Sequence, residues 1–416
     1  MRLTLLTLAV LLPVAARGEE EKNAPLRLDL DKAAKVAWPK IDKDLEPVPF
    51  ATPDGKEGWI VRIPGGLPLA TPAVAGGRLY LGGGYGSHEF YAFDAATGKL
   101  RWRLKTNDDG PTAAVVEDGL VAFNTESCTV VVCNAATGEV VWQEWLGDPL
   151  MSMPAIWKGR LYIAYPGGQV PPGAHGHGEG GGAGGHRMLC ADLKTGEHLW
   201  EAPIAADVIT APVVEGGRLF FTCHDGTSYC MEAESGKVAW KKADAGTSAP
   251  LVAGGRMLRT RKTVEDGRVF EILAGGRVAD GADAATPVAK RAAPYLAPGG
   301  NGVVGLGLAA QEAADAGVGF GGGAPAAALK AVDNLGFRTV AAGWAYQGSR
   351  GGMARDSYCL AQGTFISCLT PAGDAAKWRC VAVGEGLPDN AQVFAPPSLG
   401  RRSMFLDTQP AALDTS

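Results

Sequence analysis

The sequence predicts an all-β fold made of repeated four-stranded antiparallel sheets. The first observation is a recurring motif in which an apolar strand ends in an Asp-x-x-Thr-Gly turn and a Trp follows four residues after the Gly. The second is a series of short glycine turns, each leading into a strand rich in β-forming residues, which indicates hairpins. The third is composition, because 59 glycines and only 20% charged residues suit a protein with many tight turns. Four-stranded units of about 40 to 45 residues are typical of propeller blades, so we expect an eight-bladed β-propeller, with seven blades as the alternative.

The turn of the motif is built from residue types that reverse the chain. In the clearest copy, Asp94 can accept hydrogen bonds from backbone N–H groups two or three residues on, and Gly98 takes the positive φ that closes the turn. The Trp on the next strand has a large apolar face to bury against a neighbouring sheet. In other copies Asn134 replaces the Asp, and Glu232 and Ser235 replace the Asp and the Thr. The Gly and Trp pairs are Gly98 and Trp102, Gly138 and Trp142, Gly196 and Trp200, and Gly236 and Trp240.

The N-terminus has the pattern of a secretory signal peptide over residues 1–18. Arg2 precedes a largely apolar run from Leu3 to Ala16, and small residues follow it. An N-terminal strand or core helix is the alternative, and it fits the position and length of the run less well. The run is too short for a comfortable membrane span, and no cysteine follows it to carry a lipid. Residues 19–50 are interpreted as a polar leader that is partly disordered. We therefore expect a periplasmic or secreted protein without a transmembrane segment.

Net charge excludes two classes of partner. The chain carries 39 basic and 44 acidic residues, a net charge of −5, with no long run of one sign. It therefore lacks the basic surface that nucleic acids and anionic membranes require. We expect one propeller domain over residues 51–416, acting as a monomer.

Eight candidate blades start near residues 71, 111, 151, 210, 247, 290, 341 and 392. A glycine-rich insertion near residues 167–186 explains the long interval before Trp200, and a second insertion covers residues 281–335. The fifth blade departs from the motif, since Gly275-Gly276-Arg277 stands where the Thr-Gly is expected and Asp280 stands where the Trp is expected. The motif returns near residues 356–360 and leads to Trp378.

The two ends of the chain predict how the ring closes. The last residues, from Ala412 to Ser416, match the strand that precedes a Thr-Gly turn but stop before any Trp. Near the N-terminus, Gly55 and Trp59 supply the missing Gly and Trp. We expect Trp59 to Ile63 to be the outer strand of the last blade, paired with the C-terminal strand, which removes an exposed sheet edge.

The cysteines leave two interpretations open. Cys223 and Cys230 flank one turn and Cys359 and Cys368 flank another, so each pair could face across a hairpin and form a disulfide in an oxidising compartment. The alternative is that they are small buried hydrophobic residues, because Cys190 and Cys230 stand in the register of Ala92.

These repeats resemble the pyrroloquinoline quinone (PQQ) repeat family, whose tryptophan docking motif reads Ala-x-Asp-x-x-Thr-Gly-x-x-x-Trp, as from Ala92 to Trp102. The resemblance covers residues 52–260 well and residues 340–416 weakly. It implies a propeller in which the Trp residues pack between blades. The family includes quinoprotein alcohol and glucose dehydrogenases and also non-catalytic, BamB-like propellers, so the resemblance implies no single activity.

Several features expected of a quinoprotein dehydrogenase are missing from the sequence. It has no adjacent pair of cysteines, no Cys-x-x-Cys-His for a c-type haem, and no assignable Asn, Glu and Asp set for the calcium that activates PQQ. We therefore expect a non-catalytic scaffold that binds a protein partner in the cell envelope, with no cofactor and no catalytic residue. Cofactor-binding residues are unknown. The alternative is a PQQ- and calcium-dependent dehydrogenase of alcohols or sugars.

A histidine-bearing loop is the remaining candidate site. His175, His177 and His186 lie in or beside the first insertion, and imidazole suits zinc, copper or nickel. Glycines on both sides make the loop costly to order. We therefore expect no metal site there, with a transition-metal site as the weaker alternative.

Overall fold

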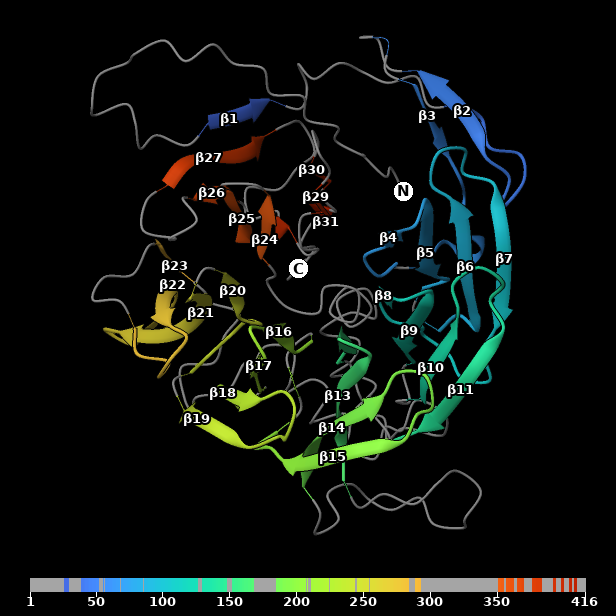
Figure 1. The fold of residues 1–416 in the computed structure, drawn as a ribbon. Coiled ribbons are helices and arrows are strands. Elements are labelled where there is room, and N and C mark those ends of the chain that lie inside the picture. The colour runs from blue at the N-terminus through green and yellow to red at the C-terminus, as the bar shows by residue number, and fades with distance from the viewer. Residues whose placement is uncertain are drawn as a thin grey trace, which may run out of the picture.

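The computed structural model consists of β-sheets placed around a ring, with N-terminal and C-terminal strands in neighbouring parts of it (Figure 1). The structure describes residues 26–29, 39–283 with gaps, 289–292, 351–354, 357–362, 365–369, 376–383, 392–393, 398–399, 404–405 and 408–409. The gaps within 39–283 are 52–54, 56, 68, 85, 126–128, 148–151, 168–184, 207, 209–210, 224, 244 and 254. In the described part of the chain, no helix is long and apolar enough to cross a membrane.

Five four-stranded antiparallel sheets follow one another between residues 73 and 292, which confirms the predicted all-β fold and its blades. Blade 1 consists of β4 (Ala73–Ala75), β5 (Arg78–Gly82), β6 (Glu89–Asp94) and β7 (Leu100–Lys105). Blade 2 consists of β8 (Val115–Glu117), β9 (Leu120–Asn124), β10 (Thr129–Asn134) and β11 (Val140–Trp145). Blade 3 consists of β12 (Ala155–Trp157), β13 (Arg160–Pro166), β14 (His186–Asp192) and β15 (His198–Pro203). Blade 4 consists of β16 (Val213–Glu215), β17 (Arg218–Thr222), β18 (Thr227–Glu232) and β19 (Val238–Ala243). Blade 5 consists of β20 (Leu251–Ala253), β21 (Arg256–Glu265), β22 (Arg268–Arg277) and β23 (Ala289–Ala292).

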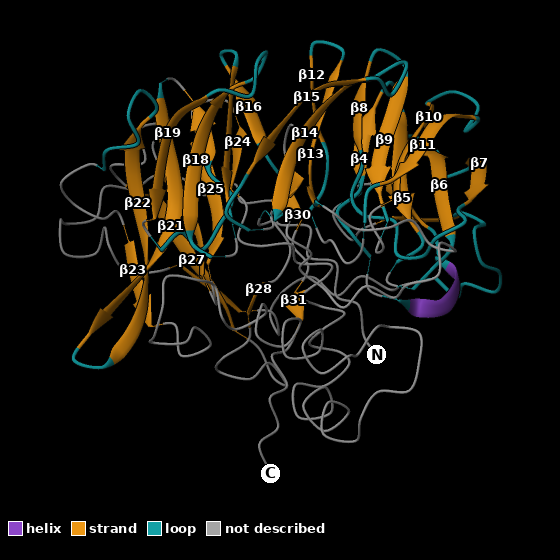
Figure 2. Cartoon of the chain, turned by 90° about the horizontal axis from the view of Figure 1, so that it is seen from below, coloured by secondary structure: helices purple, strands orange, loops and turns teal. Residues whose placement is uncertain are grey.

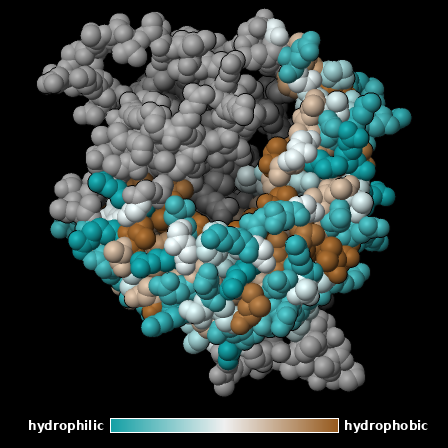
Figure 3. Space-filling view, viewed as in Figure 1, coloured by the Kyte–Doolittle hydropathy of each residue, from teal (hydrophilic) through white to brown (hydrophobic). Residues whose placement is uncertain are grey.

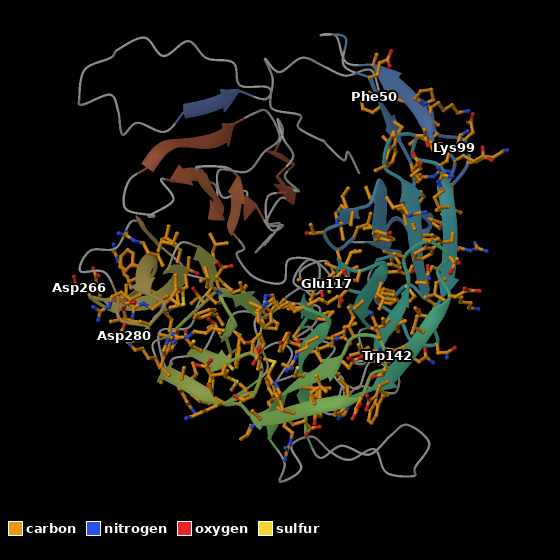
Figure 4. The ribbon with its side chains drawn as sticks, in the orientation of Figure 1. Phe50, Lys99, Glu117, Trp142, Asp266 and Asp280 are labelled. Atoms are coloured by element: carbon orange, nitrogen blue, oxygen red, sulfur yellow. The ribbon has the colours of Figure 1, made fainter. Side chains whose placement is uncertain are left out.

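The first strand of each blade lies toward the centre of the ring and the fourth lies outside (Figure 1). Figure 4 shows the same arrangement in side chains, with Glu117 toward the centre and Trp142 and Lys99 toward the outside. Apolar cores fill the spaces between neighbouring sheets. Between blades 1 and 2, for example, the rings of Phe90 and Phe123 stack with their centroids 4.0 Å apart, and both are fully buried.

The predicted turn chemistry is present in the first copy of the motif. Oδ1 of Asp94 accepts hydrogen bonds from the backbone N–H groups of Ala96 (3.1 Å) and Thr97 (2.9 Å), and Gly98 has a φ of +70°. The pKa of Asp94 lies well below its usual range because Arg101 and Thr97 hydrogen-bond to its carboxylate.

Five Trp residues dock onto the glycine turn of the next sheet, as the family resemblance implies. The indole N–H of Trp102 donates to the carbonyl of Ala135 (3.1 Å), and its ring covers Gly138 so closely that a Cβ there would lie 2.7 Å from the ring. The glycine therefore serves two purposes, since it closes its own turn and admits the neighbouring indole. The same hydrogen bond joins Trp59 to Ala95, Trp142 to Leu193, Trp200 to Ala233 and Trp240 to Val278.

Blade 5 corrects two sequence expectations. Gly275 and Gly276 do not form its motif turn, because they lie within β22 opposite Leu258 and Met257. The turn runs from Arg277 to Gly281, where Gly281 has a φ of +65° and receives the ring of Trp240. Asp280 lies in this turn. The expected blade start near residue 290 is also wrong, because β23 is the outer strand of blade 5.

A further sheet comes from the C-terminal part of the chain. It consists of β24 (Gly351–Ala354), β25 (Ser357–Gln362), β26 (Phe365–Leu369) and β27 (Ala376–Val383), and Trp378 lies opposite Cys368, the motif register. The leader contributes β1 (Leu26–Asp29), which pairs with β27 in parallel as a fifth strand. Two short two-stranded sheets follow: β28 (Gln392–Val393) pairs with β31 (Thr408–Gln409), and β29 (Ser398–Leu399) pairs with β30 (Met404–Phe405).

Ring closure is partly as expected. Trp59 lies on β3 (Glu57–Ile60) and docks on blade 1 as an outer-strand Trp should. Its described strand partner is β2 (Val48–Ala51), and residues 412–416 lie outside the described residues. Val74 of blade 1 is 65% exposed, whereas its counterparts Val116 and Ile156 pack against the preceding sheet. This side of blade 1 is therefore where a last blade fits, and the number of blades stays a prediction.

The two ends of the sheets differ, as seen from the side (Figure 2). One end carries tight turns, and the other carries the tip of the long β21–β22 hairpin and the short 3₁₀ helix Pro64–Gly66. We call the first the tight-turn face and the second the loop face. The first insertion leaves from the loop face. The pairing of β13 with β14 extends to Pro166 and His186, and beyond it the backbone N–H of Gly167 donates to the carbonyl of Gly185 (2.8 Å).

The cysteine alternatives are partly resolved. Cys223 and Cys230 are both buried thiols that form no disulfide, so the predicted bridge between them is wrong. Cys190 and Cys230 lie opposite Trp200 and Trp240, in the register of Ala92 opposite Trp102, as expected for small buried residues. Cys359 and Cys368 are directly opposite each other across β25 and β26, and their disulfide stays a prediction.

Candidate functional site

The histidines of the alternative metal site are only partly within the described residues. His175 and His177 lie outside the described residues, and His186 begins β14, where burial lowers its pKa against the opposing charge of Asp225. Among the residues that the structure describes, no group of three or more His, Cys, Asp or Glu side chains could hold a metal ion.

The connection between blades 1 and 2 is a fixed part of the loop face. The carboxylate of Asp108 accepts hydrogen bonds from the hydroxyl groups of Thr125 and Thr129, and Thr125 is fully buried. Burial and the neighbouring charge of Asp108 raise the pKa of Asp109. His88, which precedes β6 on the same face, is exposed. These contacts anchor the loop and give the face a stable shape.

The outer rim carries a cluster of charged side chains between blades 2 and 3. Nε2 of His198 lies 2.9 Å from Glu144 of β11, and its Nδ1 lies 3.1 Å from Glu201 of β15. Burial lowers the pKa of His198, but the hydrogen bonds and charges of the two glutamates outweigh it and raise the pKa above its usual value. Arg187 of β14 lies 3.5 Å from Glu201. The cluster is an inter-blade link whose charge state depends on pH.

On the tight-turn face, an arginine forms a second link between neighbouring blades. Nη1 of Arg160 donates to the carbonyl of Glu234 (3.0 Å) in blade 4, and Nη1 of Arg218 reaches the carbonyl of Val278 (3.5 Å) in blade 5. Each arginine begins the second strand of its blade and lies opposite the turn acid, Asp192 or Glu232. The arginine and the motif Trp of one blade therefore both hydrogen-bond to the motif turn of the next blade.

Blade 2 lacks this arginine, and a hollow opens there. Leu120 takes the arginine position and Asn134 lies opposite it in place of the acid. A hollow of about 400 Å³ lies at this point, where blades 1, 2 and 3 meet. It is lined by Arg78, Asp118, Gly119, Leu120, Asn134, Ala135, Ala136, Val141 and Lys194. Lys194 is the blade 3 counterpart of Glu234, since each directly follows a residue whose carbonyl accepts the indole N–H of a motif Trp.

Apolar side chains on this part of the ring are scattered. The exposed apolar residues of the outer strands include Leu100, Val140, Val141, Leu199 and Val238, each one or two residues before a motif Trp. In the space-filling view, hydrophobic patches on the face shown are separated by hydrophilic residues (Figure 3). Val141 belongs both to this series and to the lining of the hollow.

Sequence reasoning did not find the rim cluster, the arginine links or the hollow. The arginine links did leave a signal, because Arg78, Arg160, Arg218 and Arg256 each follow a glycine turn at one fixed position, where blade 2 has Leu120. The rim cluster left none, because His198 and Glu144 belong to different blades.

Comparison with known proteins agrees with the repeats. A family model described as outer membrane protein assembly factor BamB matches residues 48–171 and 180–290, more than half of the chain. The chain is 23% identical over 227 residues to an outer membrane protein assembly factor BamB of Nitrosomonas eutropha, covering 51% of this chain and 50% of that protein.

A catalytic relative is also found. The chain is 32% identical over 206 residues to the quinoprotein alcohol dehydrogenase PedH of Pseudomonas putida, covering 44% of this chain and 30% of that protein. A crystal structure of BamB from Moraxella catarrhalis aligns with a TM-score of 0.45 and 14% identity over 81% of this chain and 77% of that chain. The chain spans about half the length of the curated BamB relatives that it matches.

Proposed function

The chain belongs to the family described as outer membrane protein assembly factor BamB, and on that premise we propose that it is an exported, non-catalytic scaffold that binds a protein partner in the cell envelope. The match of the family model across blades 1 to 5 carries this proposal. The proposed place is the periplasm or the extracellular space, reached by a signal peptide over residues 1–18. The proposed scaffold is a monomer and needs no cofactor.

The geometry supports a scaffold through its rigidity. Five Trp residues each bond to the following sheet, and two arginines add links between blades 3, 4 and 5. Buried contacts of this kind hold neighbouring loops in fixed relative positions, which is how rigid frameworks present binding residues. A protein that must offer a constant surface to a partner benefits from such a ring.

The second candidate is a PQQ- and calcium-dependent dehydrogenase, which the similarity to PedH favours. It requires a cation site with cationic partners for the quinone carboxylates. We favour the scaffold because the BamB family model matches more than half of the chain, whereas the similarity to PedH covers 44% of it.

Co-purification from the native host tests the scaffold. The full chain, tagged at its C-terminus, is recovered from crosslinked envelope fractions, and the enriched proteins are identified by mass spectrometry. A tagged chain lacking residues 1–18 and retained in the cytoplasm is the control bait. We expect one or a few envelope proteins to be enriched at constant ratio with the exported bait alone. Equal recovery with both baits, together with alcohol-dependent dye reduction after addition of PQQ and Ca²⁺, would favour the dehydrogenase.

A further inference from the structure

The hollow on blade 2 marks a place where the repeat pattern is broken. In blades 1, 3 and 4 an arginine lies opposite an acid, as Arg78 does opposite Asp94 and Arg160 does opposite Asp192. In blade 2 the pair is Leu120 and Asn134, so both charges are gone together. A leucine has no guanidinium to donate to the turn of blade 3. Leu120 instead packs against the apolar core between blades 2 and 3, and the space beside Lys194 is open.

The charges that line the hollow are mainly positive. Arg78 enters from blade 1 and Lys194 from blade 3, against the single carboxylate of Asp118. The acid opposite Arg78 is already bound, because Asp94 lies 2.5 Å from Nη2 of Arg101. The side chain of Arg78 also interacts with the hydroxyl group of Tyr80, so what it offers to the hollow is its positive charge.

The rest of the lining is apolar and partly exposed. Leu120 is half-buried, and Val141, on the outer strand of the same blade, is 47% exposed. An apolar floor next to two cationic groups is complementary to a chain segment that carries a carboxylate beside an apolar side chain. The volume, about 400 Å³, falls in the usual range of about 300 to 1,000 Å³ for binding pockets.

We infer that the Leu120 hollow is a docking site for an acidic, apolar peptide segment of a partner protein, with a carboxylate toward Arg78 and Lys194 and an apolar side chain on Leu120 and Val141. This inference rests on the proposed scaffold function and gives it a surface and a partner chemistry. Because the other described blades keep the arginine, the site belongs to blade 2 and not to the repeat as such.

Peptide binding to the full chain tests the site. The probe is a fluorescein-labelled hexapeptide of alternating leucine and glutamate, followed by fluorescence anisotropy, and its matched control alternates leucine and glutamine. The glutamate peptide should bind in a salt-sensitive way, and the glutamine peptide should bind at least about tenfold more weakly, since charged hydrogen bonds are lost.

Two variants and one matched control locate the binding. The double substitution Leu120→Arg with Asn134→Asp rebuilds the pair of the neighbouring blades, so it should fold and fill the hollow. Lys194→Glu reverses one lining charge without touching the core. Both should weaken binding about tenfold or more. Lys237→Glu changes an exposed lysine beside the equivalent turn of blade 4 and should leave binding unchanged.

The inference fails if the glutamine peptide binds equally well, if neither peptide binds, or if Lys237→Glu weakens binding as much as Lys194→Glu. Its failure is distinguishable from that of the scaffold function. If envelope partners co-purify equally with the Leu120→Arg, Asn134→Asp chain, the scaffold stands and the docking site is elsewhere. If the unmodified chain co-purifies with no partner, the scaffold function itself is wrong.

Discussion

The docking of Trp102 on Gly138 leads to a quantitative prediction for a single methyl group. Gly138 has a φ of +78°, and a Cβ added to it would lie 2.7 Å from the indole ring, which is 9% exposed. Gly119, in the same blade, has a φ of +77°, and a Cβ added there would meet nothing within 4 Å. The two glycines therefore share the backbone requirement and differ only in the indole.

Gly119→Ala should lower the free energy of unfolding by about 1 to 2 kcal/mol, the cost of a left-handed conformation for a residue with a Cβ. Gly138→Ala carries the same cost and must also displace the ring. Overpacking of this kind typically costs about 1 to 3 kcal/mol, and loss of the bond to Ala135 adds about 0.5 to 1.5 kcal/mol. We expect Gly138→Ala to be the more destabilising by about 1.5 to 4.5 kcal/mol.

Urea unfolding followed by far-ultraviolet circular dichroism measures both variants without relying on Trp fluorescence. The Trp102→Ala background supplies a control, because without the ring Gly138→Ala should cost no more than Gly119→Ala, as coupled neighbours require. If the two alanine variants are equally destabilised in the unmodified chain, the indole does not depend on the glycine and the docking argument is wrong.

Three further predictions concern other parts of the ring. Trp142→Phe removes the donor to Leu193 (2.9 Å) and should cost about 1 to 3 kcal/mol in urea unfolding, because the carbonyl is left without its partner. His198 has a folded-state pKa above its unfolded value, so its stabilisation is present below the unfolded pKa and is lost as pH rises through the folded one. The melting temperature of the unmodified chain should therefore exceed that of His198→Gln at pH 5.5, and the two should converge at pH 8.5. The free energy that this exposed cluster contributes should be no more than about 1 kcal/mol. A difference in melting temperature that grows with pH would contradict this. Burial raises the pKa of Cys133 to about 12 and that of Cys190 to about 11, so iodoacetamide at pH 8 should modify both only after unfolding, and peptide mapping that finds them alkylated in the folded chain would disprove it.

The blades with a complete motif were predictable because each signal is local. Asp94 and Gly98 set their turn by contacts within five residues, and in all four complete copies the Trp follows the Gly at the same spacing. Blade 5 was not predictable in this way. Gly275 and Gly276 imitate a turn in the sequence, but they lie within a ten-residue strand, and only pairing with Leu258 and Met257 distinguishes the two.

Contacts between distant segments could not be predicted at all. The strand Leu26–Asp29 lies in a segment interpreted as a polar leader, and nothing in its four residues identifies β27, about 350 positions away, as its partner. Likewise His198 and Glu144 gain meaning only once blades 2 and 3 are side by side. Local sequence patterns specify a single blade, whereas the contacts between blades depend on how the copies pack against one another.

At Leu120, blade 2 departs from the arginine that the other described blades carry at the same position. A position that links neighbouring blades is under the same physical demand in every copy, because each turn has a carbonyl to satisfy and a gap to fill. When one copy replaces both members of the pair, the link is lost and the cost falls on the interface between blades 2 and 3. The Trp142 bond to Leu193 still holds that interface, so the ring tolerates the change. Leu120 itself packs against the apolar core between blades 2 and 3, and outside that core the exchange leaves open a cationic hollow with an apolar floor.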